Sequence, residues 1–193
     1  RCAGDELRAA DVGVAMGERG TDVAREAAAI VLLDDRFSSL VEAVRAGRRI
    51  YANLRKAMGY LFAVHVPIVG MSLLPVLGGP VLLLPIHIVM LELIIDPACS
   101  LVLEAEALDE DGMRVPPRAP DAPLFSLSDI ARSLVVGGMA LAAVAAAQWA
   151  GHAATLSDDA LRLTGLASII VANVAMLFWF RGASHRHLPR TNR

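Results

Sequence analysis

The chain has 193 residues, of which 55% are hydrophobic and 20% are charged, and its formal net charge is −2. This balance excludes a disordered chain and a disulfide scaffold, and it offers no basic surface for nucleic acid, so no nucleic-acid partner is expected. The two cysteines, Cys2 and Cys99, are far apart in the sequence and form no metal-ligand or disulfide pattern.

Residues 1–37 alternate short apolar segments with turns. Segments 12–16 and 29–33 predict two strands, and segment 22–28 between them predicts a helix. A strand, a helix and a strand in this order are typical of a parallel α/β sheet. About 37 residues are too few to cover both faces of such a sheet, so we expect this segment to belong to a larger domain.

Residues 38–56 carry apolar side chains at helical spacing, and no proline lies between Ser38 and Val66. We expect a stalk helix that is capped by Ser38 or Ser39 and runs unbroken into the first long apolar segment.

Four apolar runs have the length of membrane spans: 57–77, 81–103, 133–150 and 163–180. At the helical rise they extend roughly 27–35 Å, which matches a hydrocarbon core of about 30 Å. The alternative, buried helices of a soluble protein, is less consistent with the runs because such helices keep a polar stripe. The predicted fold class is mostly α, a four-helix transmembrane bundle preceded by a short α/β segment, with the lipid bilayer as partner.

The basic residues predict the orientation of these spans. Of the 18 Lys and Arg residues, only Arg162 lies in 151–162, the longer of the two segments that four spans place outside. The positive-inside rule therefore predicts that both termini are cytoplasmic. No signal peptide precedes the first span, so we expect the amino-terminal part to be cytoplasmic. Together with the four spans, this predicts a multi-pass protein of the cell membrane. Residues 104–132, with an acidic run at 104–111, are interpreted as a solvated cytoplasmic linker, and residues 181–193 as a basic cytoplasmic tail.

Ionisable side chains inside the first two spans predict a cation site. Glu92 and Asp96 are four residues apart and share one helix face. Each costs roughly 2.5–3.5 kcal/mol at the centre of a span, which is rarely tolerated without a partner or a function. Counted by helical rise, His65, Glu92 and Asp96 lie roughly 10–16 Å from the cytoplasmic ends of their spans. Antiparallel neighbours would bring the three to one level.

Two prolines free backbone carbonyls near that level. Pro67 leaves the carbonyl of Ala63 without its helical partner, and Pro97 does the same to Leu93. Freed carbonyls beside carboxylates are typical of cation sites in broken membrane helices.

Structural alternatives remain open for each polar residue in the spans. Glu92 and Asp96 are also consistent with a hydrogen-bonded pair that holds helices together. His65 and His87 are also consistent with neutral histidines that bond across helices. Gln148 and Asn173, in the last two spans, are expected to bond between helices rather than to bind ions.

Three separated groups of motifs, in order, resemble P-type cation-transporting ATPases of the calcium-pump-like bacterial subgroup. The first group is Ala-Ala-Asp-Val-Gly-Val-Ala-Met-Gly at 9–17, Gly-Thr-Asp-Val-Ala-Arg-Glu-Ala-Ala at 20–28 and Val-Leu-Leu-Asp-Asp at 31–35. The second is Gly-Arg-Arg-Ile at 47–50 with Asn-Leu-Arg-Lys at 53–56, and the third runs from Pro85 through Glu92 to Asp96-Pro97.

This resemblance implies a role for each segment. Residues 1–37 correspond to the end of the HAD-like phosphorylation domain, 38–56 to the stalk, and the four spans to helices five to eight, with the cation site in 57–103 and the last hairpin in 133–180. It places His65, Glu92 and Asp96 at ligand positions for the transported cation. Ile68 stands where calcium pumps carry an acid and Ile95 where they carry a hydroxyl, which argues against calcium specifically.

The departures from the family pattern concern ATP chemistry. The phosphorylated-aspartate motif, the nucleotide-binding domain and the first four membrane helices have no counterpart, and no carboxylate falls where the family binds magnesium. We therefore expect a carboxy-terminal fragment that binds no cofactor and does not hydrolyse ATP alone. ATP and Mg²⁺ are implied for the complete pump, whose amino-terminal half is the missing partner. The alternative is a non-catalytic membrane subunit or a non-functional remnant.

Overall fold

The computed structural model describes residues 3–78, 81–107, 110–117, 119 and 123–182. Within these ranges the side chains of residues 3, 96, 98–100, 110 and 111 are left out of the description. The chain divides into two units, residues 1–48 and 49–193, which are described separately.

The first unit contains a small parallel sheet. Its elements in chain order are α1 (Ala3–Ala9), β1 (Val14–Met16), α2 (Asp22–Ala27) and β2 (Ile30–Leu32). Strands β1 and β2 pair in parallel, with Val14 opposite Ile30. The predicted strand, helix and strand are therefore confirmed, and each strand is two residues shorter than predicted. Helix α1 has no counterpart among the predicted elements.

The turn between β1 and α2 is held by one arginine. The Arg25 guanidinium donates hydrogen bonds to the carbonyls of Gly17 at 2.6 Å and Gly20 at 2.9 Å. The Thr21 hydroxyl accepts the backbone N–H of Ala24 at 3.2 Å and so caps the start of α2. These contacts fix the course of the chain around α2.

Two aspartates after β2 accept hydrogen bonds within the same unit. Partial burial raises the pKa of Asp35, but hydrogen bonds from the backbone N–H groups of Glu18 and Arg19, each at 3.0 Å, outweigh it and hold the pKa below its ordinary value. The pKa of Asp34 is lowered mainly by the Ser39 hydroxyl, which donates to its carboxylate at 2.6 Å. Both side chains are therefore engaged in local structure.

Helix α3 (Phe37–Leu73) confirms the prediction of one uninterrupted helix. It starts one residue before Ser38, and the Ser39 hydroxyl donates to Asp34. A 3₁₀ turn, η1 (Leu74–Leu77), follows, and Gly78 with φ +85° ends it in the left-handed conformation that glycine adopts without strain.

The rest of the second unit is helical. Its elements are α4 (Pro85–Ala98), the π-helical segment η2 (Cys99–Glu104), the 3₁₀ turn η3 (Glu110–Met113), α5 (Leu127–Ala153) and α6 (Asp158–Gly182). By length and composition, three helical segments among the described residues can cross a membrane: Phe37–Leu77, Leu127–Ala153 and Asp158–Gly182. The fold is mostly α, as predicted, and the chain is a multi-pass membrane protein.

The second predicted span, 81–103, differs from the other three. The helix begins only at Pro85, in the first-turn position that proline favours, and its regular apolar part is shorter than the other spans. Pro97 has no N–H to bond the carbonyl of Leu93, and the helical pattern changes from α to π at Cys99. The predicted four-helix count thus holds only if α4 and η2 are taken together.

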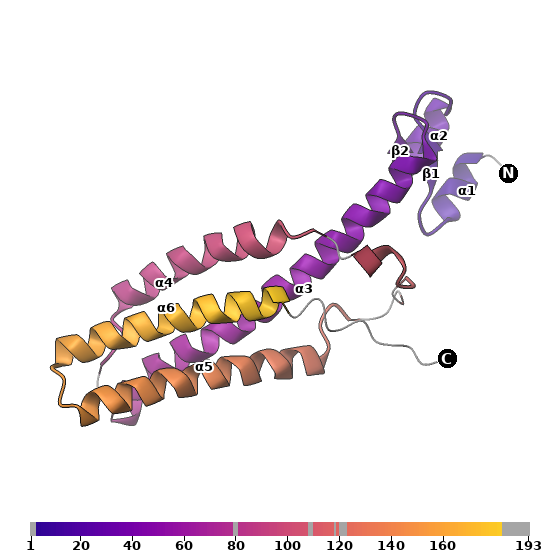
Figure 1. The fold of residues 1–193 in the computed structure, drawn as a ribbon. Helices are drawn as coiled ribbons and strands as arrows, with labels where there is room; N and C mark the ends of the chain where they lie inside the picture. The colour runs from indigo at the N-terminus through magenta and orange to yellow at the C-terminus, as the bar shows by residue number, and fades with distance from the viewer. Residues whose placement is uncertain (1–2, 79–80, 108–109, 118, 120–122, 183–193) are drawn as a thin grey trace, which may run out of the picture. The chain divides into compact units, whose positions relative to one another are not determined.

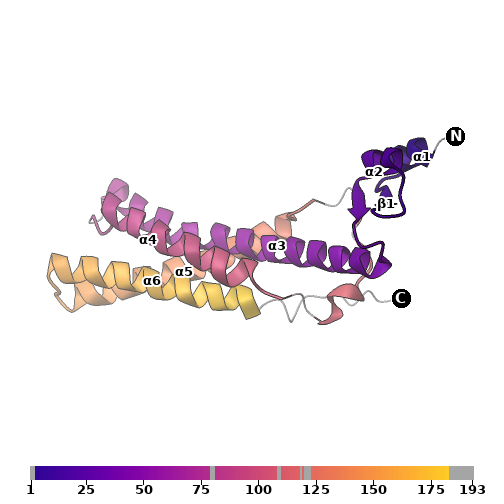
Figure 2. The same ribbon diagram turned by 90° about the horizontal axis from the view of Figure 1, so that it is seen from above.

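The second unit contains two antiparallel helix pairs, α3 with α4 and α5 with α6 (Figures 1 and 2). Helix α6 contacts both α4 and α5. The core between the helices is built from buried side chains such as Tyr60, Val64, Leu91 and Ile169.

Helices α3 and α5 approach closely at a glycine. A Cβ atom added at Gly137 would overlap the carbonyl oxygen of Ala63, and the neighbouring Gly138 faces open space. Gly137 is therefore required by the close contact between the two helices.

Candidate cation site

Helix α3 fixes the orientation of His65. The ring Nδ1 lies 2.7 Å from the carbonyl oxygen of Leu61, one turn earlier in the same helix. Since a carbonyl oxygen only accepts, Nδ1 carries the proton of this bond, and in a neutral ring the lone pair is on Nε2. This nitrogen points away from the α3 backbone.

Helix α4 brings Glu92 to the same place. The Oε1 atom of Glu92 lies 3.6 Å from Nε2 of His65, and the two side chains are 37% and 48% exposed on the described surface. Helical rise predicted that His65 and Glu92 would lie at a similar depth in their spans, and their approach from two antiparallel helices agrees with this. An imidazole nitrogen with a lone pair and a carboxylate oxygen are thus available together.

Asp96 lies one turn beyond Glu92 on α4, in the helical part of the chain, but its side chain lies outside the described residues. Among the side chains that the structure describes, no group of three or more His, Cys, Asp and Glu converges. The structure thus brings together His65 and Glu92 of the three predicted site residues.

The two freed carbonyls have different surroundings. The Ala63 carbonyl is buried against Gly137 of α5, so the expectation that it stands free beside the carboxylates is wrong. The physical reason is that glycine allows the α5 backbone to cover the oxygen closely. Leu93, whose carbonyl Pro97 deprives of a partner, lies on α4 next to Glu92.

His87 takes no part in this arrangement. Its Nδ1 accepts the backbone N–H of Leu84 at 3.3 Å, at the start of α4. The alternative that His87 bonds across helices is therefore wrong for this nitrogen, since its partner lies three residues away in the same turn.

A second cluster, which sequence reasoning missed, attaches α3 to the segment after η2. We call Asn53, Arg55 and Lys56 the α3 tether. The side-chain amide of Asn53, buried to 3% exposure, donates to the backbone carbonyls of Glu104 at 2.9 Å and Glu106 at 2.8 Å. The Lys56 ammonium lies 2.7 Å from the Glu106 carboxylate.

The third member of the α3 tether reaches α5. The Arg55 guanidinium lies 2.5 Å from Asp129, which also forms a capping box with Ser126 at the start of that helix. Glu106 is half-buried and paired with Lys56, so the interpretation of the acidic run as solvated is wrong for this residue. The sequence does contain a signal for these contacts: basic residues lie just before the first span, and acidic residues lie just after the second.

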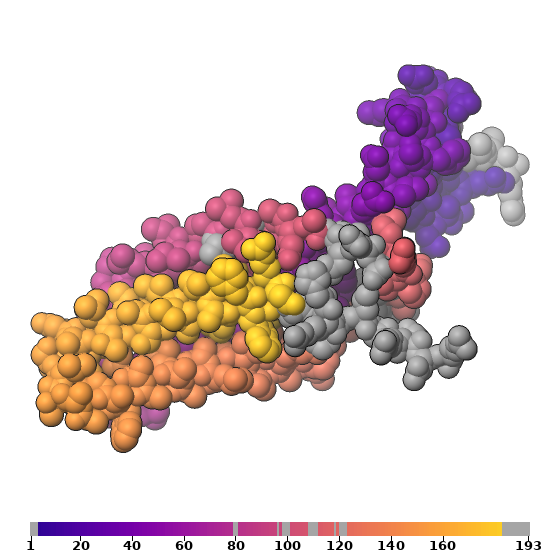
Figure 3. Space-filling model, viewed as in Figure 1, coloured from indigo at the N-terminus to yellow at the C-terminus, as the bar shows by residue number. Residues whose placement is uncertain are grey.

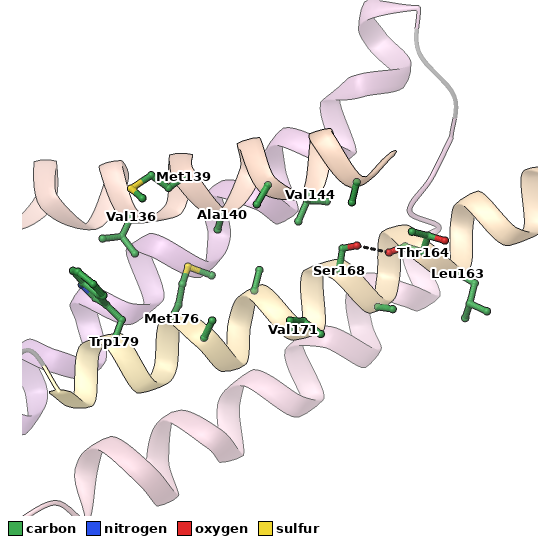
Figure 4. Close-up of a pocket in the computed structure, with 15 residues that line it drawn as sticks. Val136, Met139, Ala140, Val144, Leu163, Thr164, Ser168, Val171, Met176 and Trp179 are labelled. Atoms are coloured by element: carbon green, nitrogen blue, oxygen red, sulfur yellow. Dashed lines mark hydrogen bonds between the residues drawn. The ribbon is translucent and has the colours of Figure 1, made fainter. Parts of the chain in front are cut away.

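Helices α5 and α6 enclose a groove of about 790 Å³ that is lined almost entirely by apolar side chains, including Met139, Met176 and Trp179 (Figure 4). The hydroxyls of Thr164 and Ser168 donate to backbone carbonyls one turn earlier, at 2.7 and 2.6 Å. No acidic or basic residue lines the described groove. The two helices lie side by side in the space-filling view as well (Figure 3).

The two carboxamides of this hairpin do not bond as predicted. Both amide atoms of Gln148 and the Oδ1 atom of Asn173 are buried without a hydrogen-bond partner among the described residues, so the expectation of interhelical bonds is wrong for these atoms. Gln148 lies directly over Gly165, where a Cβ would meet its Nε2 at 2.9 Å. The glycine makes room for the amide but presents no side-chain acceptor to it.

Three apolar helices of membrane length among the described residues define a polytopic membrane protein, and the histidine of α3 and the carboxylate of the shorter helix α4 form a candidate ion site. Residues 80–193 match the family described as "Cation transporting ATPase, C-terminus". The chain belongs to this family, and the resemblance to P-type cation-transporting ATPases is confirmed.

Several curated proteins are similar to the chain. It is 46% identical over 121 residues to "Calcium-transporting ATPase 1" of Bacillus cereus, covering 62% of the chain and 14% of that protein. It is 37% identical over 132 residues to "Calcium-transporting ATPase 2, endoplasmic reticulum-type" of Arabidopsis thaliana, covering 68% of the chain and 12% of that protein. It is also 37% identical over 121 residues to "P-type sodium-transporting ATPase4" of Toxoplasma gondii, covering 62% of the chain and 9% of that protein. The matched part of the chain spans a seventh or less of each relative, and their names differ in the ion.

Proposed function

We propose that the chain is the carboxy-terminal membrane part of an ATP-driven cation pump, in which His65, Glu92 and Asp96 hold the transported cation. The observation that carries this proposal is the approach of His65 Nε2 to Glu92 Oε1, at 3.6 Å, between two apolar helices of a cation-ATPase family member. Ionisable groups at this position are costly in a bilayer unless they serve binding or transport.

The proposed mechanism assigns separate tasks to the described residues. His65 and Glu92 offer a nitrogen and an oxygen to a dehydrated cation, and Asp96 lies one helical turn from Glu92. The α3 tether couples movement of α3 to residues 104–106 and to the start of α5, because Asn53 and Lys56 bond to Glu104 and Glu106 and Arg55 bonds to Asp129. A displacement of the stalk would in this way reach both helix pairs.

ATP and Mg²⁺ belong to the complete pump in this proposal. Among the described side chains no cluster of carboxylates suits Mg²⁺, and Asp34 and Asp35 are engaged by Ser39, Glu18 and Arg19. The amino-terminal half that binds ATP is the proposed partner.

The proposed location is the cell membrane, with both termini in the cytoplasm. Support comes from the distribution of Lys and Arg. In segment 151–162, which connects the last two spans, the only such residue is Arg162, as expected for an external segment. The α3 tether then lies at the cytoplasmic side of the bilayer.

Substitution of the assembled pump tests this function. Asp96→Asn is expected to abolish cation-stimulated ATP hydrolysis, because the variant keeps the size of the side chain and removes its charge. Ser168→Ala, on the α6 side of the groove, is the matched control and is expected to leave turnover unchanged. Wild-type stimulation in Asp96→Asn would contradict the site, whereas a complete pump without any cation-stimulated hydrolysis would favour a non-catalytic subunit or a remnant.

A further inference from the structure

One of the two described donor atoms of the candidate site, the imidazole nitrogen, differs from the oxygen ligands that hard cations prefer. The described groups that converge are one imidazole nitrogen and one carboxylate oxygen. Calcium takes six to eight oxygen ligands, whereas imidazole suits zinc, copper, iron and nickel. The chemical identity of His65 is therefore informative about the ion.

Among the described side chains, the buried neighbours of these two residues on α3 and α4 are apolar. Ile68, one turn after His65, is 4% exposed, and Ile95, one turn after Glu92, is 1% exposed. Both belong to the apolar core between the helices. A high oxygen coordination number is thus not available from the described side chains around the pair.

The orientation of His65 is that of a metal-binding histidine. A ligating imidazole commonly donates its other ring N–H to a carboxylate or a backbone carbonyl, which fixes the tautomer and the ring. Here Nδ1 is bonded to the Leu61 carbonyl at 2.7 Å, and Nε2 faces Glu92. This backbone contact is a second observation, independent of the approach of the carboxylate.

The separation of the two donor atoms fits a single small ion. With metal–ligand distances of about 2.1 Å, donors 3.6 Å apart subtend an angle of roughly 120° at the metal, close to tetrahedral. Partial exposure of both side chains leaves room for additional ligands. No movement of α3 or α4 is required for both groups to bind the same ion.

We propose that the cation held by His65 and Glu92 is a divalent first-row transition-metal ion of the zinc class. This inference rests on the proposed function and specifies its substrate. The similarity to calcium- and sodium-transporting relatives covers 62–68% of the chain and does not by itself specify the ion, whereas the imidazole nitrogen of His65 is a ligand that transition metals favour.

Metal binding to the complete chain in lipid nanodiscs tests the proposal. Co²⁺ is the spectroscopic probe, and Zn²⁺ and Ca²⁺ are the competitors. We expect visible d–d absorption of low-symmetry Co²⁺, displacement by equimolar Zn²⁺ and no displacement by equimolar Ca²⁺. His65→Gln is expected to weaken Zn²⁺ binding at least about tenfold, since loss of a supporting partner alone costs this much.

Two further variants distinguish loss of a metal ligand from loss of folding. His87→Gln alters the other described histidine of the first two spans and is expected to leave Zn²⁺ affinity unchanged. His65→Cys supplies a softer ligand and is expected to retain Co²⁺ binding with a new thiolate charge-transfer band. Absence of a Co²⁺ signal in the unmodified chain, equal Zn²⁺ affinity in His65→Gln, or displacement by equimolar Ca²⁺ would overturn the proposal.

Failure of this inference is distinguishable from failure of the proposed function. Stimulation of ATP hydrolysis in the assembled pump by Ca²⁺ and not by Zn²⁺ would overturn the zinc-class substrate and leave cation transport intact. Hydrolysis that responds to no cation would overturn the transport function itself.

Discussion

The pair α3–α4 and the pair α5–α6 are both antiparallel and apolar, although α4 is shorter than the other three helices, and they carry polar side chains of different kinds. In α3–α4 a histidine and a glutamate approach each other with both side chains partly exposed. In α5–α6 the hydroxyls of Thr164 and Ser168 are bonded to their own helix. The first pair has polar atoms available to a ligand, and the hydroxyls of the second are already occupied.

Under the proposed function, the difference that matters is charge: α3–α4 brings together an ionisable histidine and a carboxylate, whereas the unpartnered atoms of Gln148 and Asn173 in α5–α6 belong to uncharged carboxamides. A cation needs lone pairs that are not already used, and a Ser or Thr bonded to the preceding turn contributes little beyond helix structure. The groove between α5 and α6 is larger than a single ion requires, and its lining is apolar. Concavity alone would therefore point to α5–α6 and not to the hairpin of the proposed site.

The largest expected effect comes from removing one available polar group. Glu92→Gln in the assembled pump is expected to lower cation-stimulated turnover by more than about tenfold, because a metal ligand loses its charge. Thr164→Val, in the other pair, is expected to change turnover by less than twofold, since its hydroxyl bonds only to Ala160. Equal loss in both variants, measured as ATP hydrolysis against cation concentration, would remove the distinction between the hairpins.

Contact between the two pairs is tested by adjacent glycines. Gly137→Ala is expected to destabilise the chain by about 1–3 kcal/mol, because the added methyl group overlaps the Ala63 carbonyl oxygen. Gly138→Ala faces open space and is expected to stabilise the helix by up to about 1 kcal/mol. Denaturant titration in micelles measures both, and a stable Gly137→Ala variant would contradict the close approach.

Two buried asparagines, one with hydrogen-bond partners and one with an unpartnered oxygen, test the comparison through stability. Asn53→Leu is expected to cost about 1 kcal/mol, because the carbonyls of Glu104 and Glu106 lose a shared donor. Asn173→Leu is expected to be neutral or stabilising by less than about 1 kcal/mol, since the Oδ1 of Asn173 is buried without a partner among the described residues. The opposite order of stability, by the same titration, would show that Asn173 is the better satisfied residue.

The smallest effect on stability is expected in the first unit, where the Asp35 carboxylate accepts hydrogen bonds from Glu18 and Arg19. Its pKa is lowered in the folded state, so its contribution to stability is present above the unfolded pKa of about 4 and is lost as the pH falls through the lower folded value. Asp35→Asn should flatten this acid dependence. Hydrogen exchange of the Glu18 and Arg19 amides between pH 5 and 2 measures it, and an unchanged acid profile in the variant would contradict the assignment.

Periodicity and run length predicted the features that depend on local sequence. The strand, helix and strand before residue 37, the unbroken α3 and the long apolar helices follow from these signals. The change from α to π after Pro97 was not predicted, because a proline frees a carbonyl without specifying how the next turn rearranges.

Tertiary contacts account for most of what the sequence could not predict. The approach of His65 to Glu92 was predictable because both are placed by helical rise from the ends of their spans. The bonds of Asn53 and Lys56 to Glu106 depend on the path of the chain after η2, and the spacing of apolar residues does not predict that path. The burial of the Ala63 carbonyl depends on Gly137, which lies 74 positions further along the chain.

That buried carbonyl also has a mechanical consequence. The crossing at Ala63 lies ten residues from Asn53 and ten from Leu73, or about 15 Å along the axis in each direction. Between Asn53 and Leu73, tilting about this crossing acts as a lever with equal arms, so a shift of 1 Å at Asn53 gives about 1 Å in the opposite sense at Leu73. His65, about 3 Å from the fulcrum, would then move only about 0.2 Å. Tilting of α3 therefore leaves its ion ligand almost in place, and rotation of α3 about its own axis is the motion that would separate His65 from Glu92.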